Sequence, residues 1–368
     1  MECKVIENFD DFLKLEQPWN ELLSQTDVEH IYMKHQWFSE WIKAYNKQDT
    51  LAIVAIFRDG QLVAIAPLHR KPLRFKNTRA RGISFLSSGI SPRCNFISID
   101  NDAMKLLIEG VFNLPDWDIL DTENMELGKG VTDYYLEFLG SRDNSYSYYT
   151  ENGFECYYID IKGEWDDYWK SLSRSWRTNF KRYSLDKLRM VESHQTIHLR
   201  EENSGMRYLD VMFDVSEKSW KASVDSHLVR DSELGRLYTS FTPIGLKNEW
   251  VYIAGLKING IDAGYVYFLN HNDKYVGIRA EFDEQFKSCS PGNNLHLAII
   301  RNLFESGVAC EYDMGPDAPY KRNFCDKIKK HITVLVGNKN FKGRWIMFSK
   351  NHVMPALRRL KSSTGRTT

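Results

Sequence analysis

Two β-hairpin signals constrain the fold of this chain more than any other feature. Asp59-Gly60 and Asn259-Gly260 each separate two apolar runs, which span residues 51–57, 61–68, 250–257 and 261–270. Both dipeptides suit the two-residue turns of antiparallel hairpins, whose central residues need a positive φ. After each hairpin the pattern continues with a glycine-containing turn, a helix and a short strand. The chain is therefore predicted to be of the α/β class, with two related halves that each have a central mixed (α+β) sheet flanked by helices.

The length and composition agree with two halves. A chain of 368 residues can form one large or two medium domains, and 42% hydrophobic residues suffice for a packed core. We expect an N-terminal half at residues 1–160, a basic connecting helix at 161–192, a C-terminal half at 193–345, and a basic helix and tail at 346–368. Residues 71–81 are rich in Lys and Arg and are predicted to be a loop.

The charge is balanced overall but uneven along the chain. Lys and Arg number 49, as do Asp and Glu, so we expect no DNA partner. Residues 327–368 nevertheless contain eleven Lys or Arg residues and no acidic residue. This segment predicts a basic amphipathic helix that Pro355 kinks or splits. The helix is either a solvated face or a surface for a polyanion or an anionic membrane. Its apolar residues are Trp345, Ile346, Phe348, Val353, Leu357 and Leu360.

Several other classes of protein are disfavoured by missing motifs. The N-terminus lacks the charged start and apolar core of a signal peptide, and no apolar run is long enough to span a bilayer. Six dispersed cysteines form no C-x-x-C pair, and the motifs of serine hydrolases, zinc proteases and P-loop enzymes are missing. We expect a cytoplasmic protein, peripheral at most to the inner face of the membrane, with no metal.

The richest stretch of the sequence follows the second hairpin. It is predicted to contain a strand at 274–283, a helix that begins at Pro291, a strand at 308–314 and a further helix at 318–330. The apolar positions of the first helix are Leu295, Leu297, Ile299, Ile300, Leu303 and Phe304.

The start of that helix is a candidate anion site. A helix start offers unpaired backbone N–H groups and the positive end of its dipole, and a glycine there allows close approach. A pyrophosphate could bind on Gly292, Asn293 and Asn294. An ordinary helix cap explains the same residues.

An ordered set of short motifs in this stretch resembles a known family. The motifs are Ser290-Pro291-Gly292, Leu295, Asp313-Met314-Gly315 and Tyr320-Lys321. They resemble the C-terminal part of the CelD-like acyltransferases, which are related to the Fem-type peptidoglycan aminoacyltransferases within the GNAT superfamily. The resemblance extends less sharply over residues 30–345 and implies that both predicted halves are GNAT-like.

The resemblance implies a cofactor site for acyl-CoA, most of all acetyl-CoA, as co-substrate. It assigns the pyrophosphate to Gly292, Asn293 and Asn294 and adds Ser290 to the cofactor-binding residues. Lys321 is a further cofactor-binding candidate, which could stabilise a phosphate or carboxylate or could be an ordinary solvated lysine. Tyr320 would protonate the leaving sulfur, although a packed helix residue explains this tyrosine equally well.

The base that deprotonates the amine stays open among four carboxylates: Glu217, Glu281, Asp283 and Asp313. Glu281 and Asp283 share one strand face, and Asp313 can equally be a helix cap.

Three residues are candidates for substrate binding. Arg177 fits the spacing of the family's basic connecting helix, where it could neutralise phosphates or belong to a solvated linker helix. Trp220 follows Glu217 at a helix end where the family often has an acidic residue and a tryptophan. Asp283 is the third candidate.

These expectations lead to one principal function and two alternatives. The principal function is N-acyl transfer from acyl-CoA to the amine of a small acceptor, such as an amino sugar or another envelope or polysaccharide precursor. The first alternative is a Fem-type transferase that uses aminoacyl-tRNA, and tRNA is a partner only in that case. The second is a non-catalytic module of the same fold in a polysaccharide-synthesis system.

Overall fold

A computed structural model of the chain divides into two compact units. The first comprises Met1–Phe154 and Lys330–Thr368, and the second comprises Glu155–Lys329. None of the helices in the described part of the chain is long and apolar enough to cross a bilayer. The structure describes residues 1–75, 78–141, 144–189, 191–198, 202–325 and 327–354.

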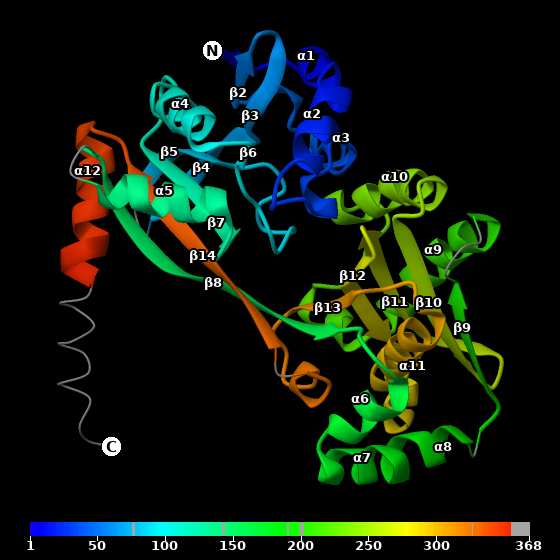
Figure 1. The fold of residues 1–368 in the computed structure, drawn as a ribbon. Coiled ribbons are helices and arrows are strands. Elements are labelled where there is room, and N and C mark those ends of the chain that lie inside the picture. Colours follow the sequence, from blue (N-terminus) through cyan, green and yellow to red (C-terminus); the bar gives the residue numbers. More distant parts are fainter. Residues whose placement is uncertain (76–77, 142–143, 190, 199–201, 326, 355–368) are drawn as a thin grey trace, which may run out of the picture. The chain divides into compact units, whose positions relative to one another are not determined.

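The first unit contains two groups of strands with helices around them (Figure 1). One is an antiparallel sheet in the order β1 (Glu2–Ile6), β2 (Ile53–Arg58), β3 (Gln61–Ala66), β6 (Ile97–Ser98). The other has the order β4 (Leu68–Phe75), β5 (Thr78–Phe85), β7 (Ile119–Glu126), β14 (Lys327–Gly337), β8 (Ser147–Asp160). The helical elements are α1 (Phe9–Leu13), α2 (Glu16–Ser24), η1 (Ile31–Met33), α3 (His35–Ala44), η2 (Gln48–Thr50), α4 (Asn101–Phe112), α5 (Gly130–Gly140), α12 (Phe341–Phe348) and η7 (Ser349–Val353).

The second unit contains a mixed sheet. Its order is the end of β8 (residues 155–160), β13 (Glu311–Pro316), β12 (Lys274–Phe282), β11 (Ile261–His271), β10 (Val251–Ile258), β9 (Ser193–His198), with β12 and β13 parallel. The helical elements are α6 (Trp165–Ser171), α7 (Arg174–Phe180), η3 (Lys181–Leu185), α8 (Asp186–Arg189), α9 (Glu202–Glu217), η4 (Trp220–Val224), α10 (Glu233–Lys247), η5 (Glu284–Cys289), α11 (Pro291–Ser306) and η6 (Lys321–Asn323). The predicted α/β class with mixed sheets flanked by helices is confirmed.

Both predicted hairpins are present. The turn between β2 and β3 has φ values of 51° at Asp59 and 83° at Gly60, and the turn between β10 and β11 has 51° at Asn259 and 77° at Gly260. These positive values are the ones that Asp-Gly and Asn-Gly accommodate in a two-residue hairpin.

Helices cover both faces of the central strands of the second unit. The apolar residues of α11, including Leu295 and Ile299, join Tyr252 and Phe268 in one core cluster. On the other face, Thr242 and Tyr238 of α10 contact Tyr267 of β11. Because α11 is held by this core, its first turn has a defined position at the end of the sheet.

The expectation of a loop at residues 71–81 was wrong. This segment belongs to β4 and β5, which pair antiparallel from Leu68 with Phe85 to Phe75 with Thr78. β4 is an edge strand, where Pro72 does not interrupt a ladder, and Lys and Arg on an edge oppose pairing with other chains. The basic residues therefore mark a protected edge strand.

The helix expected at residues 318–330 was also wrong. The structure has a single 3-10 turn, η6, followed by the long strand β14. Lys327 and Lys330 of this strand are exposed, whereas Thr333 to Gly337 are all buried, and the strand pairs with β7 from His331 to Gly337.

The structure divides the chain differently from the predicted boundaries. Residues 330–345, expected in the C-terminal half, belong to the first unit because β14 pairs with β7 from His331 to Gly337. Helices α6, α7 and α8, which were expected to connect the halves, belong to the second unit. Helix α12 belongs to the first unit, and the end of the predicted basic helix, including Pro355, Leu357 and Leu360, lies outside the described residues.

Candidate functional site

A cavity of about 680 Å³ lies in the second unit, at the carboxyl end of β12. Its walls come from residues 277–282 of β12, the start of α11, the segment 318–321 after β13, and the start of η4. Four segments that are distant in the sequence therefore meet at one cavity.

The carboxyl end of β12 is shaped by a β-bulge. Tyr267 of β11 pairs with Arg279 and Phe268 pairs with Gly277, so Ile278 is the extra residue on β12. The parallel register between β12 and β13 covers three pairs that end at Val276. Bulges re-aim side chains next to functional sites, and the residues beyond this one line the cavity.

The first turn of α11 opens onto the cavity. Pro291 is its first residue, no side chain caps it, and its first internal hydrogen bond runs 3.1 Å from the Asn294 N–H to the Ser290 carbonyl. The N–H groups of Gly292 and Asn293 thus have no acceptor within the helix. A Cβ built on Gly292 would meet nothing nearer than Phe282, at 3.8 Å, so the backbone is accessible there.

Asn294 has a structural role instead. Its side chain is buried and donates to the carbonyl of Cys289 at 2.7 Å and to Ser184 Oγ at 3.0 Å. These bonds join the turn before α11 to η3. Asn294 does not line the cavity, whereas Ser290, Gly292 and Asn293 do.

The charges around the cavity are mostly positive. The lining includes four cations, Lys221, Arg279, Lys287 and Lys321, and one carboxylate, Glu281. Glu281 Oε1 lies 2.5 Å from Arg279 Nη2 and 3.1 Å from Lys221 Nζ, so two of the cations face this carboxylate. The remaining excess of positive charge favours an anionic ligand.

Burial lowers the pKa of two of these lysines. It lowers the pKa of Lys221, and it lowers the pKa of Lys321 to about 8. Lys321 Nζ donates to the carbonyl of Pro316 at 2.5 Å, which holds the amine beside the last strand residue of β13.

Tyr320 belongs to a chain of three polar groups. Its hydroxyl lies 3.4 Å from His296 Nε2, and His296 Nδ1 lies 3.0 Å from the hydroxyl of Tyr312. Burial lowers the pKa of His296 to about 3 and raises the pKa of Tyr320 to about 12. Near neutral pH the imidazole is therefore uncharged and the phenol keeps its proton.

The other predicted carboxylates lie outside the cavity lining. Asp313 is fully buried and accepts from the Gly315 N–H at 2.6 Å, at a residue whose φ is 79°. Asp283 accepts from the backbone and side-chain N–H groups of Gln285, and so caps η5. Glu217 is exposed at the end of α9. The helix that Asp313 was expected to cap as an alternative does not form. Its bond to Gly315 instead lies inside β13, where the pairing of β13 with β8 shifts register between Asp313 and Gly315.

Of the two remaining residues predicted to bind substrate, Trp220 lines the cavity and Arg177 does not. Trp220 lines the cavity with 52% of its surface exposed. Arg177 donates from Nε to the carbonyl of Leu172 at 3.1 Å and does not line the cavity. The structure thus brings together seven of the predicted residues: Trp220, Glu281, Ser290, Gly292, Asn293, Tyr320 and Lys321.

Four polar or charged cavity residues were missed by the sequence analysis: Lys221, Arg279, Lys287 and His296. His296 lies four residues after Gly292, so helical spacing places it on the same face as the helix start. Arg279 lies two residues before Glu281 and shares its strand face. Those two spacings could have identified both residues. Among the described residues, no group of three or more His, Cys, Asp or Glu side chains is placed to hold a metal ion.

Comparison with known proteins identifies the fold. Residues 174–322 match the family model for the acetyltransferase (GNAT) domain, and all of them lie in the second unit. The chain matches no curated protein sequence at a significant level. The GNAT part of the predicted resemblance is confirmed, and membership in the CelD-like group stays a prediction.

Three solved structures share the fold over most of the chain. FemX has a TM-score of 0.57 at 12% identity, and the match covers 91% of this chain and 97% of that one. A conserved protein of unknown function from Bacteroides thetaiotaomicron has a TM-score of 0.56 at 8% identity, over 92% and 100%. The C-terminal domain of a putative lysylphosphatidylglycerol synthetase from Agrobacterium fabrum has a TM-score of 0.52 at 9% identity, over 92% and 96%. Residues 174–322 therefore have the fold of a GNAT acetyltransferase domain, and the chain as a whole shares its fold with these three structures.

Proposed function

We propose that the second unit catalyses N-acyl transfer from acyl-CoA to the amine of a small acceptor. One observation carries the proposal: α11 begins without a cap, at a cavity that is rich in cations and contains Tyr320. The GNAT match over residues 174–322 supports the same chemistry.

The cavity suits the phosphates of a coenzyme. The free N–H groups of Gly292 and Asn293 can donate to a pyrophosphate, and Lys321 and Lys287 add positive charge. Its volume of about 680 Å³ is that of a typical small-molecule site. Acetyl-CoA or a longer acyl-CoA would supply the acyl group as a thioester.

Tyr320 is the proposed donor to the leaving sulfur. With a pKa of about 12 its phenol is a weaker acid than a thiol, whose pKa is about 8.5. Tyr320 therefore stabilises the developing thiolate by a hydrogen bond more than by complete proton transfer. Neutral His296 is within contact of the same hydroxyl and holds its orientation.

The amine must lose a proton as its nitrogen bonds the acyl carbon and the carbon–sulfur bond breaks. Glu281 is the proposed acceptor of that proton, because it is the candidate carboxylate that lines the cavity. Its Oε2 has no hydrogen-bond partner among the described residues. Asp313 and Asp283 are proposed to position the backbone around the site, and Glu217 is the weaker candidate base.

The acceptor proposal rests on the family resemblance. An amino sugar or a related envelope precursor is the first class to test. Trp220, with its exposed indole on the cavity wall, offers a surface for a sugar ring. Arg177 would contribute only if a ligand extended to α7.

Calorimetry with CoA, acetyl-CoA and longer acyl-CoAs tests the cofactor. We expect binding by the wild type and loss of binding in Gly292→Val, because the added methyl groups obstruct the open amides. Gly140→Val is the matched control, since a Cβ on Gly140 also meets nothing nearer than 3.8 Å and Gly140 lies in α5 of the first unit.

The outcomes separate the alternatives. Equal binding by wild type and Gly292→Val would remove the cofactor from the start of α11. Transfer from aminoacyl-tRNA, with no binding of any acyl-CoA, would assign the Fem-type reaction. Binding of neither donor would favour a non-catalytic module.

A further inference from the structure

Helix α12 of the first unit exposes three large aromatic side chains. Phe341, Trp345 and Phe348 have 86%, 51% and 52% of their surfaces exposed. The rings of Trp345 and Phe348 stack with centroids 6.2 Å apart. Exposed aromatic residues in a contiguous group mark an interaction surface more often than isolated ones do.

These residues form one narrow stripe along the helix. With about 100° per residue, Phe348, Phe341 and Trp345 fall within an arc of about 60°. Arg344 lies to one side of this arc and Lys342 to the other. We call Phe341, Trp345 and Phe348 the aromatic stripe. It has a cation on each flank.

The opposite face of α12 holds the helix against the first unit. Ile346 and Met347 are buried in a core cluster with Ile119 and Leu335. Gly343 is also buried, and a Cβ there would lie 2.7 Å from the carbonyl oxygen of Asp118. The aromatic stripe is therefore the face left over after the helix has packed.

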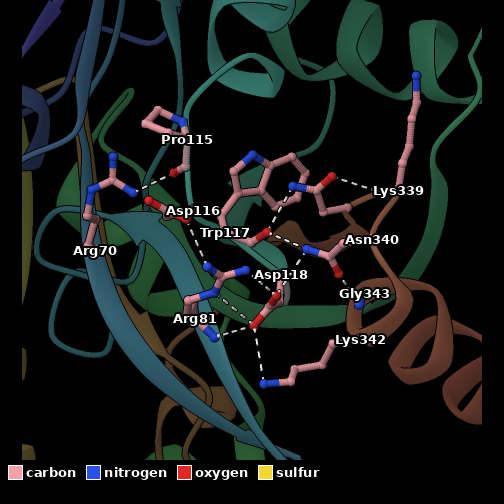
Figure 2. A network of polar contacts seen from close by, with 11 residues as sticks. Arg70, Arg81, Pro115, Asp116, Trp117, Asp118, Lys339, Asn340, Lys342 and Gly343 are labelled. Carbon is pink, nitrogen blue, oxygen red and sulfur yellow. Dashed lines mark hydrogen bonds and ion pairs between the residues drawn. The ribbon is translucent and has the colours of Figure 1, made fainter.

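A polar network fixes the start of α12 (Figure 2). Asn340 caps the helix by accepting from the Gly343 N–H at 2.8 Å. Its side chain also donates to the Trp117 carbonyl at 2.9 Å and to Asp118 Oδ1 at 3.0 Å. Asp118 is in turn bound by Arg81, whose Nη2 lies 2.9 Å from Oδ1. The helix is thus anchored to the two residues before β7 and, through Asp118, to Arg81 of β5, so the aromatic stripe is presented on a rigid support.

The segment of the chain that carries α12 is basic. Residues 327–368 contain no Asp or Glu. Arg344 is exposed, and Lys342 keeps 48% of its side chain exposed although its Nζ lies 3.9 Å from Asp118. A partner for this face must therefore be apolar where the aromatic stripe meets it and anionic around that contact.

We propose that the aromatic stripe of α12 docks the first unit on a lipid bilayer that contains anionic lipids. Trp and Phe rings insert at the boundary between headgroups and acyl chains, while flanking Lys and Arg residues bind anionic headgroups. A folded partner protein would need a matching groove rimmed with carboxylates, whereas a bilayer supplies both features to any helix of this pattern. This surface is independent of the proposed acyl transfer.

Vesicle co-sedimentation of the full chain tests the proposal. The vesicles are phosphatidylcholine alone and phosphatidylcholine mixed with phosphatidylglycerol. We expect binding to the mixed vesicles that weakens with salt and falls about tenfold or more in Phe341→Ser/Trp345→Ser/Phe348→Ser. The matched control is Val5→Ser/Leu13→Ser/Leu127→Ser, which removes exposed apolar side chains from the same unit and should bind like the wild type.

A second variant tests the charges. Lys342→Gln/Arg344→Gln should reduce the preference for the mixed vesicles and leave the weak binding to neutral vesicles unchanged. Wild-type binding by the serine triple variant would overturn the proposal. So would a wild type that binds neither vesicle and instead forms a dimer that the triple variant abolishes. Binding of CoA is measured in parallel, so that failure of this proposal is distinguished from failure of the proposed function.

Discussion

Helices α4 and α11 occupy equivalent places in the two units and begin in opposite ways. In chain order, α4 follows β5 and precedes β7, and α11 follows β12 and precedes β13. The two strands of each set pair in parallel over three positions. Asp100 caps α4 by accepting from the Ala103 N–H at 2.8 Å, and its other oxygen lies 2.9 Å from Arg58. Helix α11 has no side-chain cap and no acidic residue in its first turn.

The difference shows that a repeated topology need not repeat a ligand site. In α4 the positive end of the helix is already occupied by a carboxylate of the chain itself. In α11 the same kind of helix end stays available to an external anion. The presence or absence of a capping carboxylate at the first turn thus distinguishes a structural helix from a candidate binding helix.

The largest expected effect comes from removing the proposed donor in the second unit. Tyr320→Phe should lower kcat about 100-fold or more, because the developing thiolate loses its hydrogen bond, and should leave CoA affinity unchanged. Steady-state kinetics and calorimetry measure the two quantities. The control is Tyr183→Phe, an exposed tyrosine of the same unit. A wild-type kcat in Tyr320→Phe would refute the role of its hydroxyl.

Giving α11 the acidic first turn of α4 should have the next largest effect. Asn293→Asp places a carboxylate beside the open amides, so CoA affinity should fall about tenfold or more. The same negative charge should stabilise the folded protein by about 0.3–1 kcal/mol through its attraction to the positive end of the helix dipole, so Tm should not fall. Asn293→Ala removes the side chain without adding charge and serves as the control. Unchanged affinity in Asn293→Asp would place the phosphates elsewhere.

The lowered pKa of Lys321 predicts that the affinity for CoA depends on pH. Burial lowers the pKa of Lys321 to about 8, so the amine is a cation below pH 8 and becomes neutral as the pH rises above it. CoA affinity should therefore fall about tenfold between pH 7 and pH 9, the scale of one lost charge-assisted hydrogen bond. Lys321→Arg keeps its charge and should abolish most of this fall. If the CoA affinity of Lys321→Arg depends on pH in the same way as that of the wild type, Lys321 is not the titrating group.

The smallest effect is expected in the first unit. Asp100→Ala removes the cap of α4 and should cost about 1 kcal/mol of unfolding free energy without changing CoA affinity. Asp100→Asn keeps the capping hydrogen bond and should recover most of the loss. Chemical denaturation and calorimetry give both values. A gain of CoA binding in Asp100→Ala would mean that the two helix starts are more alike than their caps indicate.

Local signals were sufficient for the parts of the fold that local physics decides. The dipeptides Asp59-Gly60 and Asn259-Gly260 indicated both hairpins, because few other residues tolerate positive φ at two successive positions. Pro291 marked the first residue of α11, since a proline there forfeits no helical hydrogen bond. The same rules failed at residues 318–330, where the structure has one 3-10 turn and the start of β14, a strand that lies between β7 and β8 in the sheet.

The tertiary structure alone decided which of the marked residues meet. Gly292, Tyr320 and Glu281 share a cavity because the bulge in β12, the core packing of α11 and the turn after β13 bring their segments together. Asp313 and Asn294 matched the same motifs but turn inward to satisfy backbone groups. Sequence specified the two hairpins and the start of α11, because these depend on neighbouring residues. The composition of the cavity depends on contacts between distant segments, which no local pattern records.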